Sequence, residues 1–387
     1  MIKKYDVIII GGGAAGIFAA SSALSNGRTV AILDMGEKPA RKVLVSGGGR
    51  CNFTNLAVSA DRYFGKNPDF VRSVLSKLKP TDILDWAKRH NLKYVEKTAG
   101  QFFCATNSSD FVSTMLQDIN GVDIFTNTTV TDIEKSGEYF EVQSKNNVYQ
   151  SKSVIIATGG VSYPALNTSD FGYIIAKKFG HKIIPVQPGL TGLKTKLFSS
   201  ELSGISVDSE IKIGKKKIQD SLLFTHFGIG GPLAYRTSLF DLNKDIYINF
   251  LPRIDVYDWL IKIKKIEGKK SLQNLLSMHL PLNFAKWICN PDGTKNIADF
   301  KDTEIKVIAE RINNFLIPPE ELKRLGFEKA EVTVGGVSTE FISSKTMESK
   351  LCPGLYFAGE VLDIAGDLGG FNLHFAFASG FTAGNYA

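Results

Sequence analysis

Three glycines near the start of the chain have the spacing of a phosphate-binding turn. Gly11, Gly13 and Gly16 follow a short apolar run, Asp6–Ile10, and precede an alanine-rich stretch. Between a strand and a helix, the first glycine permits a tight turn, the second lets a pyrophosphate approach the backbone, and the third lets the helix lie close to the sheet. The free amides and the dipole at the start of that helix favour bound phosphate. The spacing therefore predicts a site for a dinucleotide.

An acidic residue lies at the distance that such a site requires. Asp34 ends a second apolar run, Thr29–Leu33, and lies 34 − 11 = 23 residues past Gly11. A carboxylate roughly 20 residues beyond the first glycine bonds a ribose 2′-hydroxyl. Because a carboxylate would repel a 2′-phosphate, FAD or NAD fits this site better than NADP.

A second glycine segment, Ser46–Gly49, lies within the stretch MGEKPARKVLVSGGGRCNFTN. No long strand precedes it, so we do not interpret it as another turn of the first kind. It is better explained as backbone that passes close to a ligand, with Arg41, Lys42 and Arg50 available to bind charge. A surface loop with incidental basic residues is the alternative.

Other reactive side chains have both a chemical and a structural interpretation. His374 could donate a proton or stabilise a reduced cofactor, because imidazole titrates near neutral pH; the alternative is a histidine packed or solvated on a helix. His226 could act on the substrate or stabilise a turn. Cys51 could be a redox thiol, but no second cysteine is near it in the sequence, which favours a small packed residue instead. Gly228–Gly231 could bind a nicotinamide phosphate or form a turn over the active site. The sequence contains no metal-ligand cluster and no Ser/His/Asp arrangement, so neither class of site is expected.

The chain is basic, and its lysines come in runs. Its 387 residues carry a formal net charge of +7, and the runs lie at residues 215–217, 262–265 and 269–270. An anionic partner such as nucleic acid or a membrane surface is one explanation. A solvated lysine-rich face is the other, and it is favoured because no aromatic residues are interleaved with the lysines. We therefore expect a small-molecule substrate and do not expect nucleic acid as a partner.

The cysteines and the apolar pattern indicate a cytoplasmic protein. Four cysteines lie far apart without a C-x-x-C motif, so neither a thioredoxin-like pair nor a zinc site is predicted. Such usage suits a reducing compartment. The first apolar run is too short for a signal sequence, and no stretch approaches the ~20 apolar residues of a membrane span.

The elements that would position the chemical residues alternate between strands and helices. The predicted elements are a helix at 14–26, a hairpin around Ala99, a hairpin of residues 139–144 and 148–152, a buried strand at 153–160 and a closing helix at 371–381. Hydrophobic residues make up 43% of the chain, enough for two or three domains.

The composition changes twice along the chain. Residues 190–251 have short alternating strands, residues 252–329 have amphipathic helical runs, and the first character returns at residue 330. We therefore predict an α/β nucleotide-binding domain in two parts, 1–189 and 330–387. A β-rich domain and a small helical subdomain would be inserted between these parts.

Several motifs occur together in a fixed order. They are GGGAAG, VSGGGRCNFTN, IIATGG, LLFTHFGIGGP and LYFAGEVLDIAGDLGGFNLHFAFASG. With them the chain resembles, over nearly its whole length, the BaiN-like family of FAD-dependent oxidoreductases, also called YhiN-like or aminoacetone-oxidase-like. The resemblance implies a Rossmann-like FAD-binding domain of the two-dinucleotide-binding flavoprotein type, interrupted by a β-barrel-like domain and a helical domain.

The resemblance also implies a set of contacts to FAD. The glycine turn would hold the pyrophosphate, Asp34 the adenosine ribose, and the start of the closing helix the pyrimidine ring of the flavin. The full set is Gly11, Gly13, Ala14, Ala15, Gly16, Asp34, Met35, Arg41, Lys42, Gly47, Gly48, Arg50, Cys51, Asn52, Val130, Ala157, Thr158, Gly159, Gly359, Glu360, Asp363, Gly370, Phe371, Asn372 and Leu373.

We therefore expect an oxidoreductase that binds FAD non-covalently. The expected reaction is reduction of an activated C=C bond or a related small organic substrate, with NAD(P)H as a transient electron donor. Three alternatives remain open: an amine oxidase that uses oxygen, a flavoprotein that acts on tRNA, and a non-catalytic FAD-binding regulator. The sequence indicates no oligomeric state.

Overall fold

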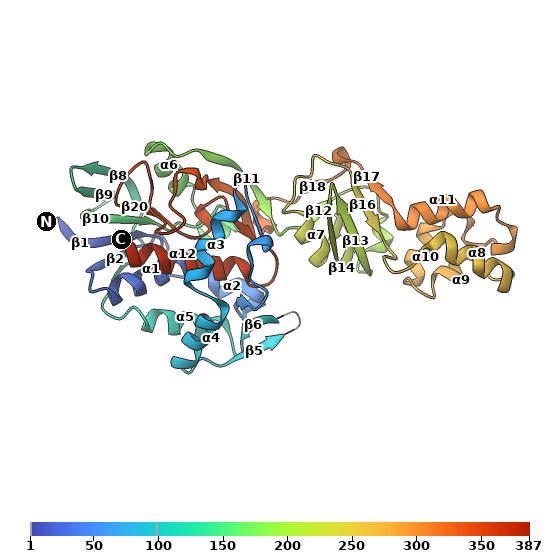
Figure 1. Ribbon diagram of the computed structural model, residues 1–387, viewed down its shortest axis with the longest axis horizontal. Coiled ribbons are helices and arrows are strands. Elements are labelled where there is room, and N and C mark those ends of the chain that lie inside the picture. Colours follow the sequence, from blue (N-terminus) through green and yellow to red (C-terminus); the bar gives the residue numbers. More distant parts are fainter. Residues whose placement is uncertain (1, 98–99) are drawn as a thin grey trace. The chain divides into compact units, whose positions relative to one another are not determined.

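The computed structural model describes residues 2–97 and 100–387. The chain folds as two compact units, one comprising Met1–Pro188 and Glu331–Ala387 and the other comprising Gly189–Ala330 (Figure 1). These limits adjoin the positions at which the composition of the sequence changes. The further predicted division at residue 251 stays a prediction.

The first unit is built on a largely parallel sheet. Its strand order is β7-β2-β1-β10-β9-β8, and β20 also pairs with β10. The last four residues of β1 and all of β2 are buried, as in a parallel sheet that is covered on both faces. The strands are β1 Lys3–Ile10, β2 Val30–Leu33, β7 Asp123–Phe125, β8 Val130–Ser136, β9 Tyr139–Ser144, β10 Val148–Ile156 and β20 Leu355–Phe357.

Strand β10 corrects one expectation. The sequence predicts a hairpin strand that ends at residue 152 and a separate buried strand after it, but the structure has one continuous strand. Its first half pairs antiparallel with β9, its last three residues pair parallel with β20, and β1 pairs with it from Tyr149 to Ile156. A change of partner along one strand leaves no break in the apolar pattern, so the sequence alone does not reveal it.

Two helices lie side by side against this sheet (Figure 1). They are α1, Ala14–Ser25, and α12, Phe371–Tyr386. A Cβ atom on Gly380 would lie 2.1 Å from the carbonyl oxygen of Ala15, and one on Gly384 equally close to that of Ala19. Their glycines therefore let the two backbones touch, which fixes the start of α12 relative to the sheet.

Shorter elements complete the first unit. β5 and β6 pair antiparallel, and the turn predicted at Ala99 lies outside the described residues. The remaining elements are α2 Arg41–Gly49, β3 Asn52–Asn55, β4 Tyr63–Phe64, α3 Val71–Lys77, α4 Pro80–Arg89, β5 Tyr94–Lys97, β6 Gln101–Cys104, α5 Ser108–Gln117, α6 Phe171–Lys178, β11 Ile183–Gly189, β19 Val332–Val337 and β21 Ala365–Gly366.

The second unit combines a seven-stranded sheet with helices around one apolar core. The strand order is β17-β16-β13-β14-β15-β12-β18, and every pairing is antiparallel. Burial alternates along β13, so one face of the sheet packs on the core and the other faces solvent. The strands are β12 Leu193–Lys194, β13 Ser206–Ile213, β14 Lys216–Thr225, β15 Gly228–Gly230, β16 Ile246–Asn249, β17 Phe315–Ile317 and β18 Lys323–Arg324.

The helices of this unit interrupt its sheet. α8 to α11 lie between β16 and β17, so the last two strands come from a segment that the sequence predicts to be helical. Three-residue and two-residue strands are too short to show a period of their own. The helices are α7 Gly231–Thr237, α8 Val256–Ile266, α9 Leu272–Leu276, α10 Leu282–Ile288 and α11 Asp302–Asn313. Among the residues that the structure describes, no helix has both the length and the apolar character needed to cross a membrane.

Candidate functional site

The three glycines of the turn between β1 and α1 differ in the space around them. A Cβ atom on Gly11 would lie 2.5 Å from the carbonyl oxygen of Ala157, and one on Gly16 would lie 1.9 Å from that of Gly11. A Cβ atom on Gly13 would have no atom within 4 Å. Gly11 and Gly16 are therefore required for packing, whereas Gly13 borders open space at the start of a helix that has no side-chain cap.

Asp34 is held rigidly at the end of β2. One carboxylate oxygen accepts a hydrogen bond from the Gly12 amide at 2.7 Å, and the other accepts one from the Gly36 amide at 2.7 Å. The guanidinium of Arg41 lies 3.5 Å from the second oxygen. The carboxylate is buried, and its remaining lone pairs are available to hydroxyl donors.

The chain after β7 runs alongside the same strand end. The Thr128 amide donates to the carbonyl of Asp34 at 2.8 Å. Val130, at the start of β8, is buried, whereas Met35 is exposed. The structure thus brings the segment that leads to Val130, one of the predicted FAD contacts, next to the segment predicted to meet the ribose.

The second glycine segment is a break within α2. Ser46 leaves the helical conformation, and Gly47, Gly48 and Gly49 have φ values of 57°, 65° and 78°. Glycine can adopt this left-handed conformation at three successive positions at a low conformational cost, which other residues cannot. Cβ atoms on Gly48 and Gly49 would have no atom within 4 Å, so this backbone also borders open space.

Cys51 follows that segment in a closed environment. It is fully buried, and burial raises the pKa of its thiol, with a smaller opposite effect of the hydrogen bond to Ser46. The structure also brings a second cysteine near it, which the sequence did not suggest: the Cys104 amide donates to the carbonyls of Arg50 at 2.9 Å and Cys51 at 3.4 Å. Both cysteines are free. A buried thiol with a raised pKa is a poor nucleophile, so the environment favours the packed-residue interpretation.

β3 lies against the start of α12. A Cβ atom on Gly370 would lie 2.7 Å from the carbonyl oxygen of Thr54 and 2.9 Å from the side-chain oxygen of Asn52. Asn52 donates to Gln101 at 2.8 Å, but its buried Oδ1 atom has no hydrogen-bond partner among the described residues. An unpaired buried acceptor beside an uncapped helix start marks a place where a ligand with an N–H group fits.

His374 is not placed for proton transfer, which corrects the catalytic interpretation. Its side chain is fully buried, with Nδ1 at 2.8 Å from the Thr54 hydroxyl and Nε2 at 3.0 Å from the carbonyl of Leu78. Because a carbonyl only accepts, Nε2 carries the hydrogen and Nδ1 accepts from the hydroxyl. Burial lowers the pKa of His374 to about 4. The residue therefore stays neutral and joins α12 to its neighbours.

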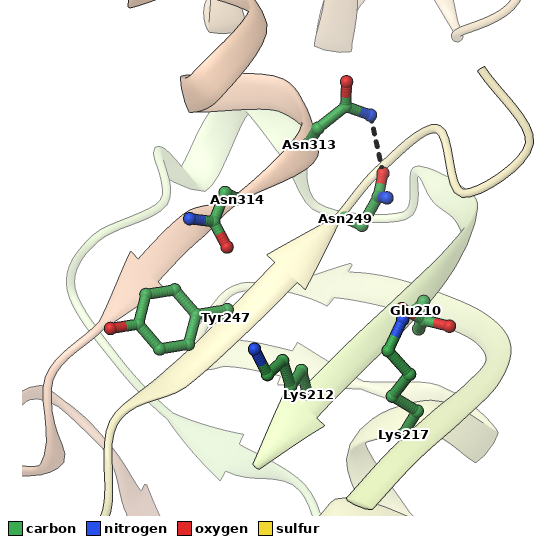
Figure 2. A pocket seen from close by; sticks show the side chains of 7 residues that line it. All are labelled: Glu210, Lys212, Lys217, Tyr247, Asn249, Asn313 and Asn314. Atoms are coloured by element: carbon green, nitrogen blue, oxygen red, sulfur yellow. Dashed lines mark hydrogen bonds and ion pairs between the residues drawn. The ribbon is translucent and has the colours of Figure 1, made fainter. Parts of the chain in front are cut away.

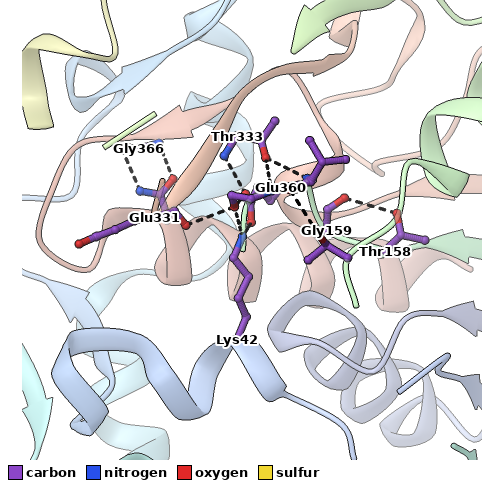
Figure 3. A network of polar contacts seen from close by, with 11 residues as sticks. Lys42, Thr158, Gly159, Glu331, Thr333, Glu360 and Gly366 are labelled. Atoms are coloured by element: carbon purple, nitrogen blue, oxygen red, sulfur yellow. Dashed lines mark hydrogen bonds and ion pairs between the residues drawn. The ribbon is translucent and has the colours of Figure 1, made fainter. Parts of the chain in front are cut away.

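A polar network links four segments that are distant in the sequence (Figure 3). The ammonium of Lys42 lies 2.5 Å from one oxygen of Glu360 and 2.6 Å from the hydroxyl of Ser162. The other oxygen of Glu360 accepts from the Thr333 amide at 2.8 Å and from Ser162 at 3.1 Å. The sequence predicted Lys42 and Glu360 separately, but nothing in it indicated their pairing or the roles of Ser162 and Thr333.

The residues near Glu360 in the sequence and at the start of α12 have different structural roles. Gly359 has a φ of 76° and lies against Ala15. The carboxylate of Asp363 accepts from the Lys66 amide at 2.9 Å, and burial raises its pKa. The side chain of Asn372 bonds to both the amide and the carbonyl of Gly366, at 2.7 and 2.9 Å. Asn372 therefore stabilises the loop before α12, and only its backbone amide remains for a ligand.

Two predicted features belong to the second unit. His226 is exposed at the turn between β14 and β15, with its ring 5.1 Å from that of Phe227. Gly228–Gly230 is strand β15, paired on both sides, and Gly231 begins α7. The segment is therefore neither a phosphate loop nor an open turn, because the sheet uses its backbone groups. A catalytic role for His226 stays a prediction.

The described residues of the first unit fit an FAD molecule. All of the predicted contacts lie in this unit, at the carboxyl ends of β1, β2, β10 and β20, in the α2–β3 segment, at the start of β8, or at the start of α12. Open space next to Gly13, Gly48 and Gly159, two uncapped helix starts and the unpaired Asn52 oxygen are what such a ligand requires. Within the described ranges, no group of three or more His, Cys, Asp or Glu side chains is arranged to hold a metal ion.

The chain is similar to known proteins over nearly its whole length. Residues 5–386 match a family described as "HI0933-like protein Rossmann domain". The chain is 35% identical over 390 residues to the "Ribosomal RNA dihydrouridine synthase" of Escherichia coli (strain K12), covering 98% of this chain and 96% of that protein. It is 28% identical over 419 residues to the "3-dehydro-bile acid delta(4,6)-reductase" of Clostridium scindens, covering 98% of both. Among solved structures, the open conformation of a flavocytochrome c3 fumarate reductase has a TM-score of 0.50 and 17% identity, covering 99% of this chain and 78% of that one; this likeness concerns the fold alone.

Proposed function

The chain belongs to the family of HI0933-like Rossmann-domain proteins and is an FAD-dependent oxidoreductase, and from this premise we propose that it reduces the C5=C6 double bond of a uridine in ribosomal RNA, giving dihydrouridine. The observation that carries the proposal is the near full-length identity to the Escherichia coli ribosomal RNA dihydrouridine synthase. Because that identity spans both compact units, it concerns the insertion as well as the nucleotide-binding unit.

The chemistry of the two named relatives has one element in common. The C5=C6 bond of uracil is conjugated to a ring carbonyl, so its C6 atom accepts a hydride and C5 then accepts a proton. The name of the bile acid reductase describes reduction of double bonds in a 3-oxo compound. Reduction of an activated C=C bond is therefore the common reaction type. With NAD(P)H as donor, one hydride and one proton convert uridine to dihydrouridine and leave NAD(P)⁺.

The chain itself would bind and orient the reactants. Bound FAD would supply the hydride. The first turn of α1 would hold the pyrophosphate beside Gly13, and Asp34 would bond a ribose hydroxyl. The positive end of α12, at Gly370 and Phe371, would stabilise negative charge on the ring of the bound cofactor. These roles are proposals for the same residues that the sequence predicted.

This proposal replaces the expectation of a small-molecule substrate without nucleic acid. That expectation depended on the absence of aromatic residues among the lysine runs. The relatives now favour a polyanionic substrate, and the net charge of +7 suits one.

A second candidate is reduction of a conjugated double bond in a small 3-oxo steroid-like compound. The observation that favours it is the 28% identity to the bile acid reductase, which also covers 98% of both chains. The two candidates share the flavin chemistry and differ in the substrate that the chain must bind.

The test uses purified protein loaded with FAD. Ribosomal RNA transcribed in vitro is incubated anaerobically with the holoprotein and either NADH or NADPH, digested to nucleosides, and analysed by mass spectrometry for dihydrouridine. We expect dihydrouridine at a defined position with at least one donor. If neither donor yields dihydrouridine while a conjugated 3-oxo steroid is reduced, the ribosomal RNA proposal is wrong and the second candidate stands.

A further inference from the structure

The solvent-facing side of the sheet in the second unit contains a polar pocket. Its volume is about 200 Å³, and we call it the Tyr247 pocket. Strands β13, β14 and β16 and the end of α11 supply its lining (Figure 2). The lining residues are Glu210, Lys212, Lys217, Tyr247, Asn249, Asn313 and Asn314.

The strand register places an aromatic ring beside a basic side chain. Lys212 is directly opposite Tyr247 on one neighbouring strand and opposite Lys217 on the other. The ammonium of Lys212 lies 6.0 Å from the centre of the Tyr247 ring. These residues are 35 positions apart in the sequence, so the aromatic residue that is missing from the lysine runs is supplied across the sheet.

Charge remains available in this pocket. Lys217 is paired with Glu210 at 2.9 Å, whereas Lys212 is exposed and has no carboxylate partner among the described residues. Lys215 and Lys216 are also exposed at the adjoining hairpin. The lining of the pocket therefore has two lysines against one carboxylate, beside a half-buried ring.

The amide side chains give the pocket a fixed polar edge. The oxygen of Asn249 accepts from Asn313 at 2.9 Å and from the Leu251 amide at 2.9 Å. Asn313 in turn donates to two backbone carbonyls and accepts from the Val256 amide. Because the oxygen of Asn249 is held in this way, its NH₂ group is oriented, and within the described part of the chain that group has no acceptor.

We propose that the Tyr247 pocket binds an unpaired nucleotide of the RNA substrate other than the uridine that reacts. A base would stack on Tyr247, the NH₂ group of Asn249 would donate to a base carbonyl, and Lys212 would contact a phosphate. A ring beside lysines is the combination that single-stranded RNA requires, because stacking tolerates any base and the lysines bind the backbone. This inference rests on the proposed function for the identity of its ligand.

The test measures binding of a fluorescein-labelled 12-nucleotide oligouridylate to the FAD-loaded protein by anisotropy across a salt series. Tyr247→Ala should weaken binding roughly fivefold to 150-fold, the usual loss for one stacked base. Lys212→Gln should lower the slope of log K against log salt by about 0.7, the value for one phosphate contact on a single strand.

Two matched controls accompany these variants. Tyr247→Phe keeps the ring and should bind within about twofold of wild type, since stacking does not need the hydroxyl. Lys269→Gln removes the same charge from an exposed site of the second unit outside the pocket, and its salt slope should match that of the wild type. FAD absorbance and the thermal midpoint of each variant exclude unfolding.

The outcomes separate this inference from the proposed function. If Tyr247→Ala binds like Tyr247→Phe, or if Lys212→Gln and Lys269→Gln have the same slope, the pocket is not an RNA site, whether or not dihydrouridine is formed. If the pocket variants bind weakly as expected but the wild type forms no dihydrouridine, the proposed function is wrong and the RNA site stands. A wild type that does not bind the oligouridylate overturns the inference.

Discussion

Replacing His374 by glutamine should change how the stability of the protein depends on pH. The imidazole is fully buried and neutral, and it donates to a backbone carbonyl and accepts from a threonine hydroxyl. Glutamine also offers one donor group and one acceptor but does not take up a proton in this range. The variant therefore keeps similar hydrogen-bonding groups and removes the titration.

The magnitude follows from the pKa of the buried ring. Burial lowers the pKa of His374 from 6.5 to about 4. Between these values the unfolded chain binds a proton that the folded chain excludes, so stability is fully present above about pH 6.5 and is lost as the pH falls toward 4. A difference of about 2.5 units at about 1.4 kcal/mol per unit gives about 3 kcal/mol.

The assay is urea unfolding followed by circular dichroism at several pH values, with saturating FAD for both proteins. The difference in unfolding free energy between wild type and His374→Gln isolates this histidine from the carboxylates that titrate in the same range. We expect the wild type to lose about 3 kcal/mol relative to the variant between pH 7 and pH 4. A difference that stays flat over this range would refute the buried, neutral assignment. A variant with normal stability and FAD content but no reductase activity would restore a catalytic role.

The remaining predictions concern the proposed cofactor site. Gly16→Ala should lower both the thermal midpoint and the FAD content, because its Cβ atom would lie 1.9 Å from a carbonyl oxygen. Gly13→Ala should instead weaken FAD binding and leave the thermal midpoint of the FAD-free protein unchanged. Equal midpoints for the two FAD-free variants would contradict the packing argument. Lys42→Met should lower the free energy of unfolding in urea by about 1 to 3 kcal/mol, because it leaves Glu360 without its ion pair. The double variant Lys42→Met with Glu360→Gln should lose less stability than the sum of the two single variants. Additive losses would show that the pair is not coupled. Cys51 should resist alkylation by iodoacetamide in the folded protein and react after unfolding, as read by mass spectrometry, since burial raises the pKa of its thiol; rapid labelling of the folded protein would show an accessible thiol.

The sequence predicts the parts of the site that depend on neighbours along the chain. Gly11, Gly13 and Gly16 are fixed by one strand–turn–helix unit, and Asp34 ends the next strand. Their positions in the fold follow from local geometry, so the spacing alone is enough to predict those positions. The change in composition near residues 190 and 330 is local in the same sense, and the residue boundaries between the two units fall next to those positions.

The sequence alone did not reveal the contacts between segments that are distant along the chain. Lys42 and Glu360 are 318 residues apart, and Ser162 and Thr333 gave no signal of their own. Cys104 reaches Cys51 only because β6 returns alongside β3. Tyr247 reaches Lys212 only through the register of β13 and β16. The cysteine and tyrosine contacts depend on strand pairing, and the Lys42–Glu360 contact depends on how a helix packs against a distant turn; no periodicity in a single chain specifies either.

Burial then decides which of the reactive side chains can take part in chemistry. His374 and Cys51 lie in motifs that attract a catalytic interpretation, yet both are fully buried, and burial holds the first unprotonated and the second as a thiol at neutral pH. The polar groups left without a hydrogen-bond partner or side-chain cap at the start of α12, among the described residues, are backbone amides and the buried oxygen of Asn52. Such groups orient a ring and stabilise charge on it, but they do not exchange protons near neutral pH. The chain would therefore act on the hydride chemistry of its cofactor chiefly by position and electrostatics, and the choice of substrate would depend on surfaces such as the Tyr247 pocket.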